Sequence, residues 1–188
     1  MKAAIKFYTK LVVISFFAAC AVGILCSGIF QLSPEIEYIT VKEFFVHNSM
    51  YLLLMALGTV LTNGVLGYVL VVYNGVSLGI YIGALIKKYE VLAFFRAVLP
   101  HGFFEMTAML IWVVCPYHIF KILWNRYIRK NSHESQMKDI RKYMLLLIVG
   151  IIFCGVAALL EERVSEANFL KYYAYKEREK MENTLLKI

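Results

Sequence analysis

Five long runs of apolar residues divide the charged residues of this 188-residue chain. They lie at residues 11–30, 49–62, 64–86, 102–120 and 143–160. A helix needs about 20 mainly apolar residues to cross the hydrocarbon core of a bilayer. Hydrophobic residues make up 61% of the chain, against about 45–50% of typical soluble domains. We therefore predict an all-α membrane protein, a bundle of about five transmembrane helices in one integral membrane domain, residues 1–188.

The span boundaries depend on where the long apolar region between Val41 and Lys88 breaks. A turn at Asn74 would leave only Val76–Ile86 for the next span, which is too short to cross. A turn at Thr62-Asn63-Gly64 leaves two segments of sufficient length, so we expect the break there. The predicted spans and the charged helical tail that follows them are 11–30, 43–62, 64–86, 100–123, 143–160 and 161–188.

Two segments between the spans have mixed or polar composition. Lys87–Leu99 mixes charged residues with aliphatic and aromatic ones, which is typical of a short re-entrant or interfacial segment. Asn125–Lys142 is rich in Arg and Lys, and we expect a polar loop there. Basic loops stay on the cytoplasmic side, so the N-terminus and this loop are predicted to be cytoplasmic in the cell membrane. Five spans then place the C-terminus outside.

The net charge of +7 comes from 20 Lys and Arg against 13 Asp and Glu. Because the basic residues flank apolar runs, they indicate membrane topology and contact with anionic lipid. A nucleic-acid partner is not expected. The four cysteines all lie inside apolar runs without a CxxC pair, which favours packing roles.

Glycines recur at strict four-residue intervals in the third span. Gly75, Gly79 and Gly83 form this series, and Gly67 is in the same register. Small residues at such spacing let a neighbouring helix approach closely. We predict a helix-packing face that serves either an internal neighbour or a second copy of the chain in a homo-oligomer.

One polar cluster lies within the apolar runs, at Pro100-His101-Gly102-Phe103-Phe104-Glu105. Proline suits the first turn of a helix, so His101 and Glu105 are expected one turn apart on the same face. They could form a structural hydrogen bond, contact a partner or substrate, relay protons or bind metal, although two ligands are few for a metal. Asn74, within the third span, needs a polar partner and could join this contact site.

The order of these motifs resembles the stage II sporulation protein M family. Asn48 is followed by Asn74-Gly75-x-x-x-Gly79 and then by Leu99-Pro100-His101-Gly102-x-x-Glu105. The resemblance covers the motifs from Phe44 to Trp112 and the layout of spans along the whole chain. It departs from the family at Met109-Leu110-Ile111-Trp112, where a run of Gly and Ala is expected.

The resemblance implies a multi-span membrane protein without known catalysis. Founding members of the family organise peptidoglycan-degrading proteins at the engulfing membrane, whereas other relatives are linked to bacteriocin export or immunity. We expect a non-enzymatic scaffold that recruits cell-wall or other envelope proteins and has no cofactor, metal or catalytic residue. The alternative is a membrane subunit for peptide export or immunity, with a separate ABC-type ATPase docked at Arg126, Arg129 and Lys130. An intramembrane enzyme or proton-coupled carrier that uses His101 and Glu105 is a third hypothesis.

Overall fold

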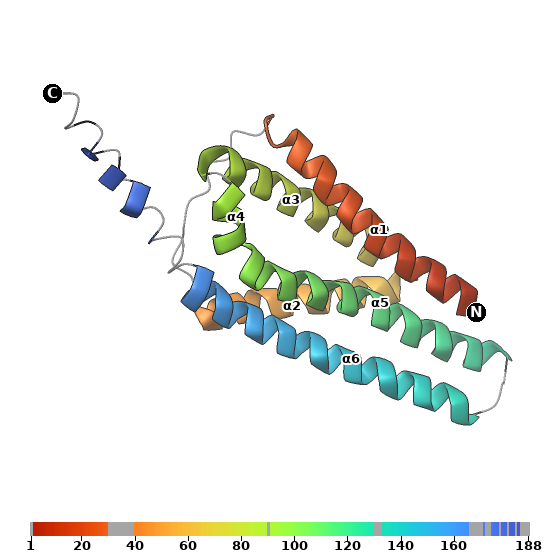
Figure 1. The fold of residues 1–188 in the computed structure, drawn as a ribbon. Coiled ribbons are helices and arrows are strands. Elements are labelled where there is room, and N and C mark those ends of the chain that lie inside the picture. Colours follow the sequence, from red (N-terminus) through yellow and green to blue (C-terminus); the bar gives the residue numbers. More distant parts are fainter. Residues whose placement is uncertain are drawn as a thin grey trace.

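The computed structural model describes residues 2–29, 40–89, 91–129 and 133–165, with nine positions of the tail: 171, 174–176, 178, 179, 181, 182 and 184. Its helices are arranged as a bundle in which α1 begins at one end and α6 finishes at the other (Figure 1). They are α1 (Lys2–Cys26), α2 (Val41–Leu61), α3 (Val65–Tyr89), α4 (Val91–Ala97), α5 (Leu99–Arg129), α6 (His133–Leu160) and the π-helical turn η1 (Glu161–Ser165).

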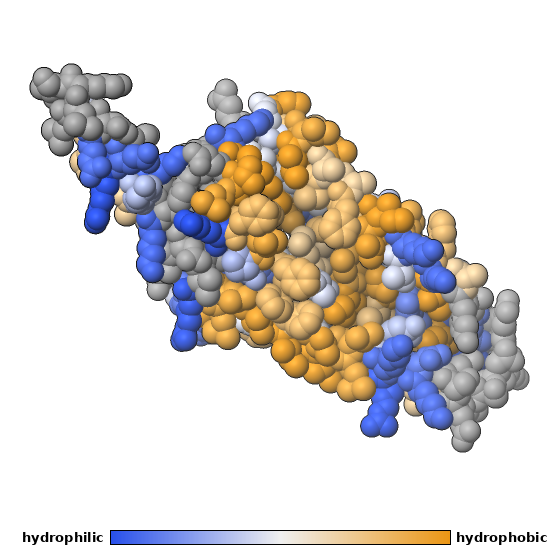
Figure 2. Space-filling model, viewed as in Figure 1, coloured by the Kyte–Doolittle hydropathy of each residue, from blue (hydrophilic) through white to orange (hydrophobic). Residues whose placement is uncertain are grey.

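Five of the described helices are long and apolar enough to span a membrane, which confirms the predicted fold class. They are α1, α2, α3, α5 and α6. Space-filling representation shows a hydrophobic belt over the middle of the molecule, with hydrophilic residues gathered toward its two ends (Figure 2). This is the surface that a bilayer requires of a spanning bundle.

The expected polar loop Asn125–Lys142 was wrong for most of its length. Asn125–Arg129 is the last part of α5, and His133–Lys142 is the first part of α6. The polarity of this sequence marks where the apolar span stops, whereas the helical backbone continues because Arg, Lys, Glu and Gln are good helix formers. Part of the predicted charged tail, residues 161–188, lies outside the described residues.

The turn between α2 and α3 lies at Thr62-Asn63-Gly64, where the sequence placed it. Asn63 has a φ of 53° and Gly64 a φ of 97°, a left-handed conformation that Asn and Gly adopt most readily. The Gly64 N–H donates to the Thr59 carbonyl at 2.7 Å, and the Thr62 N–H donates to the Gly58 carbonyl at 3.1 Å. These bonds satisfy carbonyl groups at the end of α2.

The glycine face of α3 lies against α1, which runs beside it (Figure 1). A Cβ atom on Gly75 would lie 2.9 Å from the Ala19 Cβ, and one on Gly79 would overlap the Cys20 carbonyl. A Cβ on Gly83 would overlap the Ser27 side chain. The neighbour of these three glycines is therefore an internal helix.

Gly67 does not share that neighbour. Its missing side chain leaves room for Thr59 of α2, and a Cβ there would also lie 3.2 Å from Val113 of α5. A four-residue step turns about 400° around an α-helix, so the register drifts by about 40° at each step. Across the two steps from Gly75 back to Gly67 the drift is enough to change the facing helix.

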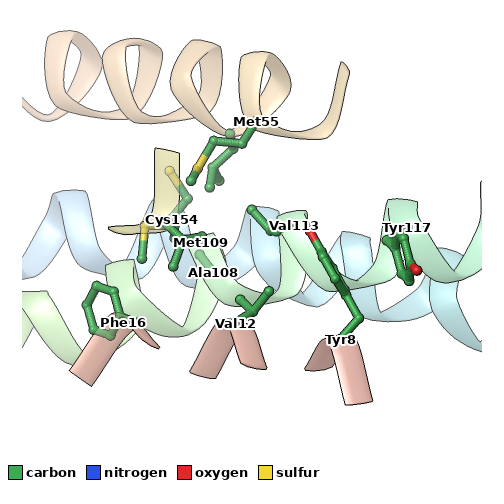
Figure 3. Packing of buried hydrophobic residues seen from close by; sticks show 11 residues of the cluster. Tyr8, Val12, Phe16, Met55, Ala108, Met109, Val113, Tyr117 and Cys154 are labelled. Atoms are coloured by element: carbon green, nitrogen blue, oxygen red, sulfur yellow. The ribbon is translucent and has the colours of Figure 1, made fainter. Parts of the chain in front are cut away.

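The core of the bundle joins all five spanning helices, α1, α2, α3, α5 and α6 (Figure 3). Its fully buried side chains include Phe16, Met55, Val113 and Cys154. At one end of this core the Tyr8 and Tyr117 rings stack with centroids 3.9 Å apart. The Tyr8 hydroxyl also donates to the Gly64 carbonyl at 2.9 Å, which fastens α1 to the α2–α3 turn.

The segment expected to be re-entrant or interfacial contains the short helix α4, which lies between the end of α3 and the start of α5 (Figure 1). Val91, Leu92 and Phe95 of α4 are exposed. Because the chain turns here through one short helix, the first turn of α5 is held close to the end of α3.

We expect Gly79→Ala to destabilise the protein by about 1–3 kcal/mol, because its methyl group would force α1 away from α3. Gly155→Ala is the matched control, since its Cβ would meet Phe45 at an ordinary 3.7 Å. It should change stability by less than about 1 kcal/mol, since alanine also favours helix. Unfolding of both variants in detergent micelles, followed by circular dichroism, measures the difference. Equal stability of the two variants would contradict the close α1–α3 contact.

Candidate functional site

His101 and Glu161 form an ion pair that joins the start of α5 to the end of α6. His101 lies in the first turn of α5 and is 9% exposed. Its Nδ1 faces Oε2 of Glu161, the first residue of η1. Ionisable groups at the level of a membrane are costly unless they are paired. The pair therefore stabilises both groups and closes this end of the bundle.

Glu105 lies one turn further along α5 and pairs with a different helix. Its Oε1 accepts a hydrogen bond from Nδ2 of Asn48 in α2. His101 and Glu105, which the sequence placed on one face, thus connect α5 to two of its neighbours, the η1 end of α6 and the helix α2. The helix α5 is the element on which these polar contacts of α2 and α6 converge.

Asn74 has the polar partner that its position in the third span requires. Its Nδ2 donates to the Tyr51 hydroxyl of α2 and, at 3.0 Å, to the Leu70 carbonyl of its own helix. The contact joins α3 to α2 at the depth of the core. Asn74 and Glu105 do not bond to one another in the described contacts, but they line one cavity.

That cavity has a volume of about 130 Å³ and is bounded by α1, α2, α3, α5 and α6. Asn48, Tyr51, Asn74 and Glu105 supply its polar wall. The rest of the wall is apolar and includes Phe16, Leu52 and Met109. Amide and carboxylate oxygens accept hydrogen bonds, so the cavity can hold water or a group that carries hydrogen-bond donors.

A larger apolar groove of about 380 Å³ adjoins this cavity, between α1, α3, α4 and α5. The same hydrophobic face of α1, α4 and α5 is visible in Figure 2. Gly102 lines the groove, and a Cβ on it would meet only Val98 Cγ1 at 3.5 Å within its surroundings. Gly102 is therefore a buried part of the groove lining, where its missing side chain leaves space beside Val98.

The other predicted residues have separate places. Pro100 lies in the first turn of α5, where its missing N–H costs nothing. Arg126 Nη1 donates to Met137 Sδ at 3.7 Å, between α5 and α6. Arg129 is the last residue of α5, and Lys130 lies outside the described residues. Arg126 and Arg129 lie far along α5 from the cavity.

Sequence reasoning did not single out Glu161, and it named Asn48 only as part of the family motif. Tyr51 was not singled out. A buried histidine that needs an acid partner was the available signal for Glu161, but the partner lies 60 residues away along the chain. Within the described residues, no three His, Cys, Asp or Glu side chains form a group that could hold a metal ion.

Comparison with known proteins gives one family and one relative. Residues 12–166 match the family described as Stage II sporulation protein M. An uncharacterized protein from Methanocaldococcus jannaschii is 29% identical over 129 residues, which cover 68% of this chain and 71% of the relative. No solved structure matches the chain significantly. The matched residues include Asn48, Asn74, His101, Glu105 and Glu161.

We expect His101→Ala and Glu161→Ala to be coupled in a double-mutant cycle, because each change leaves the other member of the ion pair without its partner. The coupling energy should be about 0.6–2 kcal/mol, the range of polar contacts between membrane helices. Unfolding of the single and double variants in detergent provides the four free energies. The control cycle combines His101→Ala with Glu162→Ala and should give the smaller coupling. Equal coupling in the two cycles would argue against a specific pair.

Proposed function

The chain belongs to the stage II sporulation protein M family, and from that premise we propose that it is a non-enzymatic membrane scaffold. It recruits envelope or peptidoglycan-remodelling proteins by binding their membrane-spanning helices. In this proposal the protein contacts membrane lipid and uses no cofactor. Localisation to the cell membrane, with the N-terminus in the cytoplasm and the C-terminus outside, is part of the same proposal.

The apolar groove is the observation that supports a docking role. It is lined by four helices and is formed wholly from apolar surface. Exposed side chains along it include Phe95 and Phe103. Helices associate in membranes through close packing of side chains, and a groove between helices offers more contact than a convex face. A partner helix seated there would fill it.

The polar groups near the groove support a role without catalysis. His101 pairs with Glu161, and Glu105 accepts from Asn48. Each of these pairs fastens one helix to another, which is a structural task. General acid–base catalysis would need such groups directed toward a substrate.

A second candidate function, peptide export or immunity beside a separate ATPase, is favoured by the length of α5. Its 31 residues rise about 46 Å, whereas the hydrocarbon core is about 30 Å thick. The excess, with the start of α6, forms a helical hairpin that carries Arg126, Lys138 and Arg141. A basic hairpin beyond the membrane is a surface on which a cytoplasmic ATPase could dock.

We expect a photo-crosslinking residue at Phe95 to capture a membrane-anchored envelope protein in native membranes, because Phe95 lines the groove and is 52% exposed. The matched control is Ile148 of α6, which is 53% exposed and lies outside the groove. It should capture lipid. Mass spectrometry of the adducts identifies the partner.

Gly102→Leu tests whether that capture depends on the groove, because its side chain would fill the space beside Val98. The Phe95 adduct should then be lost. Adducts with lipid alone at both positions would overturn the scaffold. A crosslinker at Tyr127, which is 85% exposed on the hairpin, distinguishes the second candidate, because capture of an ATPase there would support export or immunity.

The proposed orientation predicts opposite labelling at the two ends of the bundle. We expect Tyr127→Cys to resist a membrane-impermeant maleimide in intact cells and to react once the cells are opened. Arg163→Cys, at an exposed position of η1, should react in intact cells. Both are made after replacement of the four native cysteines. The reverse pattern would invert the topology.

A further inference from the structure

We propose that the cavity beside Glu105 receives the ammonium or guanidinium group of a basic side chain on the partner's membrane-spanning helix. This inference rests on the proposed scaffold function and names the chemistry of its partner. The partner helix lies in the apolar groove, and one Lys or Arg side chain reaches from it past Met106 into the cavity.

The hydrogen bonds around the cavity leave a wall made mainly of acceptors. An amide nitrogen has two hydrogens, and Asn74 Nδ2 donates to both the Tyr51 hydroxyl and the Leu70 carbonyl. A further group can therefore bind the Asn74 side chain only at Oδ1. Asn48 Nδ2 donates to Glu105 Oε1, and a carboxylate offers only acceptors. A ligand rich in N–H donors complements such a wall.

The charge of the cavity favours a cation over a neutral donor. Of the described residues that line it, Glu105 is the acid and none is Lys, Arg or His. A cation brought beside Glu105 would stabilise its ionised form, because opposite charges attract one another more strongly in low dielectric than in water. Ionisable groups of neighbouring membrane helices pair for this reason.

The groove and the cavity lie side by side, and the residues that line both of them form a partition between the two. Phe16, Leu78 and Met106 line both of them. Leu78 and Met106 are only half-buried, and methionine is unbranched and adapts its shape readily. The long aliphatic stem of Lys or Arg can lie along this apolar partition while its charged head enters the cavity, as such side chains commonly do at apolar surfaces.

The depth of the cavity favours a helix over a lipid as the occupant. The groove extends along α5 from Leu99 to Met106, whereas the cavity continues to Ala108 and Met109. A lipid with its headgroup at the surface would bring only hydrocarbon to this depth, and hydrocarbon has no donor for Asn48, Asn74 or Glu105. A helix can present a basic side chain at any depth.

The test uses two synthetic transmembrane peptides of leucine and alanine, one with a single central lysine and one with norleucine at that position. Binding to the purified full-length protein in phosphatidylcholine nanodiscs is measured by energy transfer between dyes. We expect the lysine peptide to bind about three- to thirty-fold more tightly, the range for one polar contact between membrane helices. Glu105→Gln should reduce this preference to less than about twofold. Glu162→Gln, the same change at a residue outside the cavity, should retain it.

The outcomes separate this inference from the scaffold itself. Equal binding of the two peptides to the wild-type protein would overturn the basic side chain but leave the groove as a docking site. This comparison needs no variant, so it decides the question even where Glu105→Gln does not fold. Persistent lysine preference in a folded Glu105→Gln protein would also overturn the inference. Failure of both peptides to bind would count against the groove and therefore against the scaffold.

Discussion

A buried carboxylate in a membrane needs a partner, and much of this bundle is arranged around that requirement. Hydrocarbon offers nothing to an unpaired polar group, so each polar side chain within the spans needs a partner, either in its own helix or in another one. Glu105 is satisfied by Asn48, His101 by Glu161 and Asn74 by Tyr51. These three contacts connect α2, α3, α5 and α6, and they determine how those helices are rotated relative to one another.

The remaining helix, α1, also has polar contacts, such as the hydrogen bond from Tyr8 to Gly64, but it adds a second kind of contact. α1 packs on α3 through glycine and other small residues, where backbone meets backbone. Dispersion forces between closely fitted atoms are weak singly and strong together, and they need no polar partner. The bundle thus combines polar contacts around α5 with close backbone packing along α1 and α3. The groove lies between these two parts, and the side chains of α1, α3, α4 and α5 that line it present apolar surface.

The fold class was predictable because long apolar runs, and the charged residues that flank them, mark the segments that cross a membrane. The turn at Asn63-Gly64 was predictable as well, since few residues adopt positive φ. The ends of α5 and α6 were not, because the polar residues at Asn125–Lys142 mark the edge of the membrane and still favour helix. The partner of His101 could not be predicted either, because the local spacing of residues gives no information about a residue 60 positions away along the chain. Gly67 is a similar case. It shares the four-residue spacing of Gly75 and Gly79, but the helix that it faces depends on how far this spacing rotates around α3.

The position of Glu161 along the chain has a consequence for biosynthesis. A ribosome makes α2 before α5, so Asn48 is already present when Glu105 enters the membrane. Glu161 follows the last residue of α6 and is made last of these residues. His101 must therefore wait for α6 to be inserted before its ion pair can form. A chain truncated before Glu161 would contain four complete spans and most of the fifth, yet its bundle would lack the contact with His101 that closes this end of the bundle.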